Sequence, residues 1–127
     1  MYYEQDWVMR QIEMLAQFIA RTVFHKDYIE YEIVDETNLS PSDLLYKKLA
    51  SLIRGGKICE AEDLLFENLD TKNLEYLRLA VDFYQTVNDL SDAELEAYNF
   101  SRQEVREGLE EIMEKFGIPA TILQSIL

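Results

Sequence analysis

The spacing of apolar residues is the feature that most constrains how this chain can fold. Apolar side chains return every three or four positions along most of the sequence, which is the period of one face of an α-helix. Four glycines and two prolines leave few points at which such a pattern can break. A chain of 127 residues is long enough to bury a core without disulfides. We therefore predict a single all-α domain over residues 1–127, built from six to seven helices.

The long helix expected over residues 1–25 carries two apolar stripes. The stripe predicted to face the core consists of Val8, Ile12, Leu15, Ile19 and Val23. The second stripe includes Trp7, Met14 and Phe18. Together they cover more of the helix than one neighbour can bury, so we predict that the second stripe forms an interface and that the chain is a possible homodimer. The alternative is that Trp7 and Phe18 belong to the core of the monomer.

Residues 26–39 interrupt the helical pattern and are expected to form a linker or arm. Ile29, Tyr31 and Ile33 alternate with Glu30 and Glu32, which is the period of a strand. A single strand leaves its backbone donors unpaired, so it would need a partner such as the same segment of a second subunit. The sequence leaves three alternatives open for residues 28–34: a strand, an extended linker or a continuation of the helix.

Capping sequences divide residues 40–127 into further helices. Ser40 precedes a proline and an acid at the third position, and two S-x-x-E capping boxes begin at Ser91 and Ser101. The Gly55-Gly56 pair and the Gly117-Ile118-Pro119 sequence are helix stop signals. The segment over 74–90 is apolar nearly all round, so we expect it at the centre of the core, and one more short helix is expected over residues 119–127.

One hairpin of this region resembles a tetratricopeptide (TPR) repeat. Its second half matches, with Gly56 at the turn and Ile58, Ala61 and Leu65 at the packing positions. Its first half matches poorly, and no second copy follows at the 34-residue period of such repeats. The resemblance implies TPR-like antiparallel hairpins in a right-handed array. In that family the first helix of each hairpin lines a peptide-binding groove. By this resemblance the groove residues are Tyr46, Ala50 and Ile53, and the alternative is an ordinary helix pair.

The chain as a whole also resembles a small family of proteins from Gram-positive bacteria that has no assigned function. The sequences that carry the resemblance are MYYEQDWVMRQIEMLAQFIARTVF, DLLYKKL and GKICEAEDLLFENLD. They extend over most of the chain. The resemblance supplies no catalytic residue, and it supports the expectation of a small helical protein of bacterial origin.

The formal net charge of −13 narrows the class of partners. Nucleic acids and anionic membrane surfaces would be repelled, because the 12 basic residues are scattered along the sequence. A lone cysteine, Cys59, allows no internal disulfide, and no stretch approaches the length of a membrane span. We therefore expect a cytoplasmic protein that binds neither nucleic acid nor membrane, and whose partner is a protein.

Carboxylates are the most plentiful functional group in the sequence. Glu107, Glu110, Glu111 and Glu114 fall three and four residues apart, and E-x-x-E pairs of this kind hold magnesium in all-α nucleotide pyrophosphatases. This allows an alternative function: a magnesium-dependent enzyme acting on a phosphorylated small molecule through Glu107, Glu110 and Glu111. The competing interpretation is a solvated helix face, with Glu111 paired to Lys115.

No other motif indicates catalysis. A single histidine cannot supply the ligands of a di-iron bundle, and the sequence contains no glycine-rich phosphate loop or nucleophile elbow. We therefore expect no catalytic residue, no metal ligand and no cofactor. The leading hypothesis is a non-enzymatic protein–protein interaction module, and self-association through its first helix is part of that hypothesis.

Overall fold

The computed structural model describes residues 2–119, and within them it has six helices and no strand, which confirms the all-α class. The helices are connected by turns and by one long arm. The additional helix expected over residues 119–127 lies almost entirely outside the described residues. The bounds are α1 Tyr2–Val23, α2 Pro41–Arg54, α3 Ile58–Glu67, α4 Leu74–Asn88, α5 Asp92–Ala97 and α6 Arg102–Lys115.

Three of the helices begin where their capping sequences predict. The side chain of Ser40 accepts a hydrogen bond from the backbone N–H of Asp43 at 3.1 Å, and the Asp43 carboxylate accepts from the backbone N–H of Ser40 at 3.0 Å. Ser91 and Ser101 form the same reciprocal box at the start of α5 and α6. Because each box satisfies two backbone donors that the helix leaves free, these starts could be located from the sequence alone.

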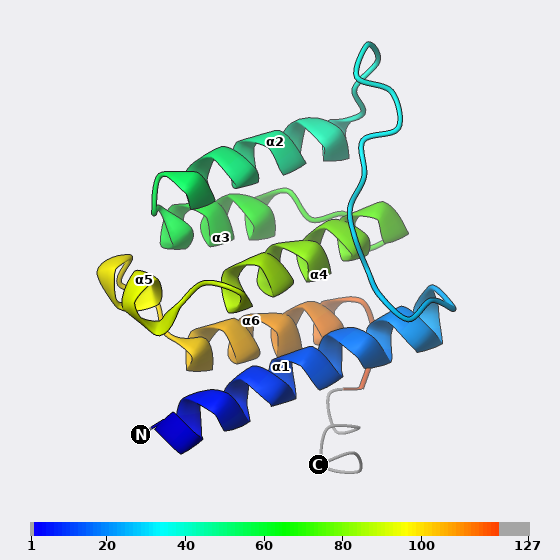
Figure 1. The fold of residues 1–127 in the computed structure, drawn as a ribbon. Helices are drawn as coiled ribbons and strands as arrows, with labels where there is room; N and C mark the ends of the chain where they lie inside the picture. The colour runs from blue at the N-terminus through cyan, green and yellow to red at the C-terminus, as the bar shows by residue number, and fades with distance from the viewer. Residues whose placement is uncertain (1, 120–127) are drawn as a thin grey trace.

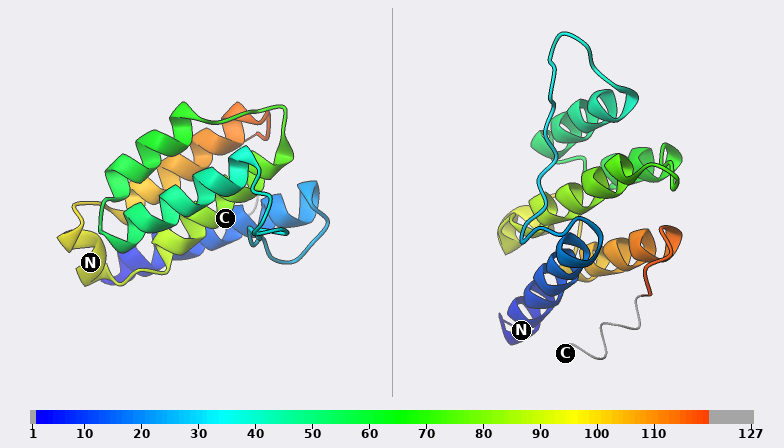
Figure 2. Two further views of the ribbon diagram at one scale, coloured as in Figure 1. Left: turned by 90° about the horizontal axis from the view of Figure 1, so that it is seen from above. Right: turned by 90° about the vertical axis from the view of Figure 1, so that its right-hand side faces the viewer.

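The helices form a stack of two antiparallel hairpins with α1 added at one end. Helices α2 and α3 form the first hairpin, α4 lies in the middle, and α6 and α1 lie at the far end (Figure 1). Helix α4 packs against α1, α2 and α6, and α1 also packs against α6, as the two other views agree (Figure 2). The central position expected for α4 is confirmed by its buried residues, which are Leu77, Leu79, Ala80, Val81, Phe83, Tyr84, Val87 and Asn88.

The turn between α2 and α3 depends on Gly56. Its φ of +75° is a left-handed conformation that a side chain rarely adopts, and a Cβ atom there would lie 2.6 Å from the ring of Tyr98. Tyr98 is the C-cap residue of the short helix α5, so α5 brings this ring to the α2–α3 turn. The TPR-like arrangement and its handedness remain predictions, because α5 interrupts the second hairpin.

The arm between α1 and α2 is extended, so the helical alternative for residues 28–34 is wrong. It crosses α4 on its way from the end of α1 to the start of α2 (Figure 1). Ile29 and Tyr31 are buried while Glu30 and Glu32 are exposed, so the alternation in the sequence does reflect an extended chain. The arm has no strand partner among the described residues, because it lies against a helix.

Candidate protein-binding groove between α2 and α4

Side chains of α4 hold the arm in place through its backbone. The backbone N–H of Tyr31 donates to Oδ2 of Asp82 at 2.8 Å, and the carbonyl oxygen of Ile29 accepts from Nε2 of Gln85 at 2.8 Å. These two side chains take the place of the neighbouring strand that an extended segment normally needs. Burial raises the pKa of Asp82, although the hydrogen bond from Tyr31 opposes that shift.

The side chain of Tyr31 anchors the arm to α2. Its hydroxyl donates to Oδ1 of Asp43 at 2.6 Å and lies 2.8 Å from Oγ of Ser42, and its ring stacks on Tyr46 with centroids 4.9 Å apart. Burial and the hydrogen bond to Asp43 raise the pKa of Tyr31 to about 12. The same hydrogen bond lowers the pKa of Asp43. The capping acid of α2 therefore also fixes the arm.

Beside the arm, an apolar groove of about 180 Å³ runs between α2 and α4. The structure brings the three expected groove residues, Tyr46, Ala50 and Ile53, together on one wall. The groove is also lined by Leu49 and Arg54 of α2 and by Leu79, Asp82, Phe83 and Thr86 of α4. The sequence did not single out the α4 wall, because a helix that is apolar nearly all round gives no sign of which residues border a groove. That a ligand binds here remains a prediction.

The second stripe of α1 is only partly covered. Trp7 is 55% exposed, whereas Met14 and Phe18 are half-buried and Phe18 packs against the core. Met14 also borders an open hollow between α1, α4 and the start of the arm. The three residues therefore do not form one pocket, and whether they mediate self-association remains a prediction.

The carboxylates of α6 point in different directions. Glu107 and Glu111 border an open hollow of about 510 Å³ opposite Glu62 of α3, whereas Glu110 lies with Arg106, whose Nε is 3.8 Å away. The hydroxyl of Tyr84 donates to Glu62 at 2.6 Å, and burial raises the pKa of that carboxyl. Within residues 2–119 no three acidic, histidine or cysteine side chains are placed to hold a metal ion. The ligand set proposed for magnesium is thus not assembled.

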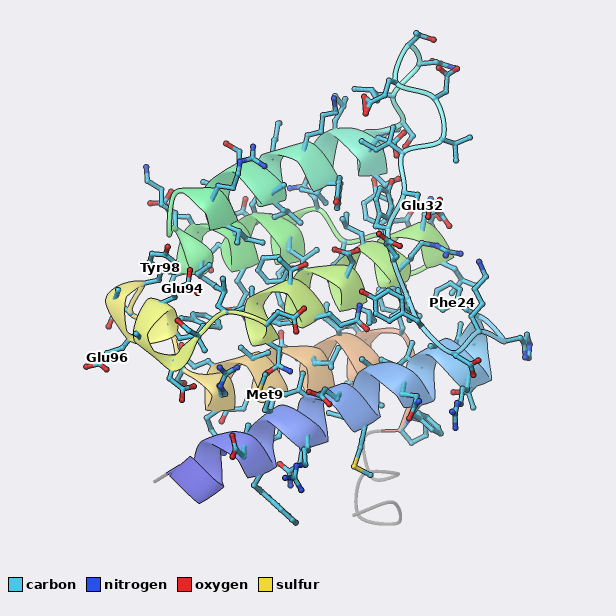
Figure 3. All side chains as sticks on the ribbon, in the orientation of Figure 1. Met9, Phe24, Glu32, Glu94, Glu96 and Tyr98 are labelled. Carbon is cyan, nitrogen blue, oxygen red and sulfur yellow. The ribbon has the colours of Figure 1, made fainter. Side chains whose placement is uncertain are left out.

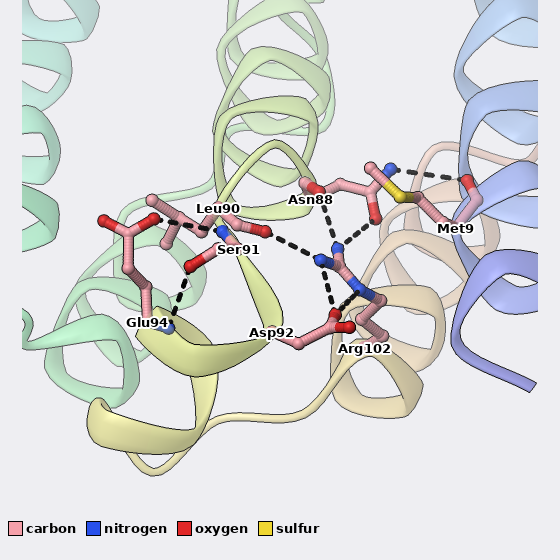
Figure 4. Close-up of polar contacts among 7 residues, drawn as sticks. All are labelled: Met9, Asn88, Leu90, Ser91, Asp92, Glu94 and Arg102. Carbon is pink, nitrogen blue, oxygen red and sulfur yellow. Dashed lines mark hydrogen bonds and ion pairs between the residues drawn. The ribbon is translucent and has the colours of Figure 1, made fainter. Parts of the chain in front are cut away.

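A buried arginine that the sequence did not single out joins α4, α5 and α6. Nη1 of Arg102 donates to the carbonyl oxygen of Asn88 at 2.6 Å, and its Nη2 donates to that of Leu90 at 2.7 Å (Figure 4). The guanidinium also pairs with Asp92 at 2.9 Å, and Nδ2 of Asn88 donates to the carbonyl oxygen of Met9 at 3.3 Å. This network fixes the C-terminal end of α4, the helix that lines one wall of the groove, to α1 and α6.

These features define a class: an all-helical protein of two antiparallel hairpins with an apolar groove between α2 and α4. None of the helices in the part of the chain that the structure describes is long and apolar enough to cross a membrane. The chain belongs to the family of unknown function DUF6483, whose model matches residues 2–117. No curated protein and no solved structure matches it.

Proposed function

We propose that this protein is a non-enzymatic protein–protein interaction module that binds a large apolar side chain of its partner in the α2–α4 groove. The groove itself carries the proposal: its walls are mainly apolar, and Asp82, Arg54 and Thr86 supply a few polar groups around them. A volume of about 180 Å³ suits one large side chain. An apolar anchor seated in such a pocket is the usual centre of a protein interface.

The groove lies on the first helices of two consecutive hairpins, α2 and α4, as the resemblance to TPR proteins implies for a peptide-binding surface. The net charge of −13 favours a protein partner that is neutral or basic over a nucleic acid. Cytoplasmic location is part of the same proposal, and it is supported by the sequence expectation alone.

Filling the groove is expected to abolish binding. Peptides are first selected from a random library on the wild-type protein and then titrated against Ala50→Trp, whose indole would occupy the groove. We expect at least a 30-fold loss of affinity, the effect of losing an anchor worth about 2 kcal/mol. Ser51→Trp, on the exposed side of the same turn, is the matched control and should bind like wild type. Selected peptides that bind both variants equally would place the binding surface elsewhere.

Self-association through α1 is a second proposal, supported by the exposure of Trp7. Light scattering behind size-exclusion chromatography should show a dimer at concentrations of roughly tens of micromolar, within the usual range for modest interfaces. Trp7→Ala should yield a monomer with an almost unchanged melting temperature, because the side chain is more than half exposed. Gln17→Ala, also exposed on α1, should leave the dimer intact. A wild-type protein that remains monomeric would contradict the proposal.

A further inference from the structure

The extended arm has two backbone edges, and α4 occupies only one of them. In an extended chain the N–H and C=O groups of alternate residues point to opposite edges. The groups bonded to α4 belong to Ile29 and Tyr31, so they define the inner edge. Glu30 and Glu32 therefore direct their backbone groups to the outer edge. No other described residue forms a hydrogen bond with those groups.

The four residues whose backbone groups lie along the outer edge are exposed. Tyr28 is 64% exposed, Val34 is 96% exposed, and Glu30 and Glu32 between them are also exposed. Figure 3 shows Glu32 beside the arm, on the side opposite to α2. An open hollow of about 410 Å³ borders these four residues. There is thus room beside the arm for a second extended chain.

The charges along this edge indicate what kind of chain it accepts. Glu30 and Glu32 occupy the middle of the edge, while Lys26 lies at the start of the arm. Two further charged residues border the hollow from α4: Glu75 and Arg78, which are paired with each other at 3.2 Å. The carboxylates of Glu30 and Glu32 have no described ion pair, in a chain whose net charge is −13. A segment with basic residues at alternate positions would place its charges opposite them.

We propose that the outer edge of residues 28–34 binds an extended, basic segment of a partner protein by strand addition. Main-chain hydrogen bonds to Glu30 and Glu32 supply the affinity, and lysine or arginine side chains opposite the two carboxylates supply the specificity. The arm of a second copy fits less well, because antiparallel pairing centred on Tyr31 would bring Glu30 opposite Glu32, and like charges repel there. This surface is separate from the α2–α4 groove and does not depend on it.

The test uses the full chain and an eight-residue synthetic peptide of alternating lysine and valine. Saturation with this peptide should slow amide hydrogen exchange at Glu30 and Glu32 at least tenfold, measured by NMR, whereas a peptide of alternating glutamate and valine should not. Two further peptides carry N-methyl groups on either all lysines or all valines. One of these two should fail to bind, because N-methylation removes the donors that face the arm. Equal binding by both, or no protection at the two amides, would overturn the proposal.

Charge reversal at Glu30 and Glu32 provides a second test. The double variant Glu30→Lys, Glu32→Lys should lose the lysine peptide and bind the glutamate peptide at least tenfold better than wild type does. The matched control is Glu13→Lys, Glu96→Lys, which reverses two exposed acids on α1 and α5 and should behave like wild type. Ala50→Trp should also bind normally, which separates this surface from the groove. If the control variant also lost the lysine peptide, net charge would explain the loss of binding, and strand addition would be overturned.

Discussion

Replacing Arg102 with methionine is expected to lower the free energy of unfolding by about 3–5 kcal/mol, the usual cost of removing one partner from a buried ionic network. The side chain is 4% exposed and donates to the carbonyl oxygens of Asn88 and Leu90, at the end of α4. Methionine keeps most of the apolar volume but leaves both oxygens without a donor, and each unsatisfied group costs about 1–3 kcal/mol. The loss should appear as a melting temperature lower by roughly 10–20 °C.

Two controls separate this effect from the loss of an ordinary surface ion pair. Asp92→Ala removes the exposed partner of Arg102 and keeps the bonds to the carbonyl oxygens, so it should cost only about 1 kcal/mol. Arg21→Met removes an exposed arginine and should change stability by less than about 0.5 kcal/mol. Urea unfolding followed by circular dichroism measures all three variants. If Arg102→Met lowered the free energy of unfolding no more than Asp92→Ala does, the hydrogen bonds from Arg102 to the end of α4 would contribute little to stability.

Replacing Gly108 with alanine should destabilise the protein by about 2–4 kcal/mol, although alanine is the better helix former by about 1 kcal/mol. The added Cβ would lie 2.2 Å from the hydroxyl oxygen of Tyr84 and 2.4 Å from Cζ of the same ring. Tyr84 is fully buried and donates to Glu62, so its ring cannot move aside without losing that bond. The close contact of α4 and α6 therefore requires a glycine at this position.

A double-mutant cycle tests this steric explanation. Tyr84→Leu removes the end of the ring, and in that background Gly108→Ala should become neutral or stabilising, which gives a coupling of several kcal/mol. Gln103→Ala, at an exposed position of the same helix, should be close to neutral. Additive effects of the Gly108 and Tyr84 substitutions would show that the two residues do not compete for the same space.

Much of the fold could be predicted from local sequence because helix starts are local events. Ser40, Ser91 and Ser101 each cap a helix with an acid three residues on, and these starts are confirmed. The central place of α4 also followed from sequence, since a helix that is apolar all round must be covered on several sides. Likewise, the positions of Tyr46, Ala50 and Ile53 on one face of a helix follow from their spacing.

The remaining features depend on contacts between distant segments. The alternation at Ile29 and Tyr31 was visible, but its cause was not, because the groups that pair with the arm are side chains of α4, Asp82 and Gln85. Arg102 resembled a surface residue at the start of a helix, where a cation is unfavourable for that helix. It is explained by the C-terminal carbonyl groups of α4, which no pattern within α6 could indicate.

The position of α1 also has a consequence for how the protein is made. Helix α1 leaves the ribosome before α4 and α6, the two helices on which it packs. Its apolar residues, including Ile12, Leu15 and Ile19, must therefore stay uncovered until α4 and α6 have emerged. During this interval the nascent chain exposes the apolar face of an amphipathic helix, so early release or stalled translation should favour aggregation or binding by a chaperone.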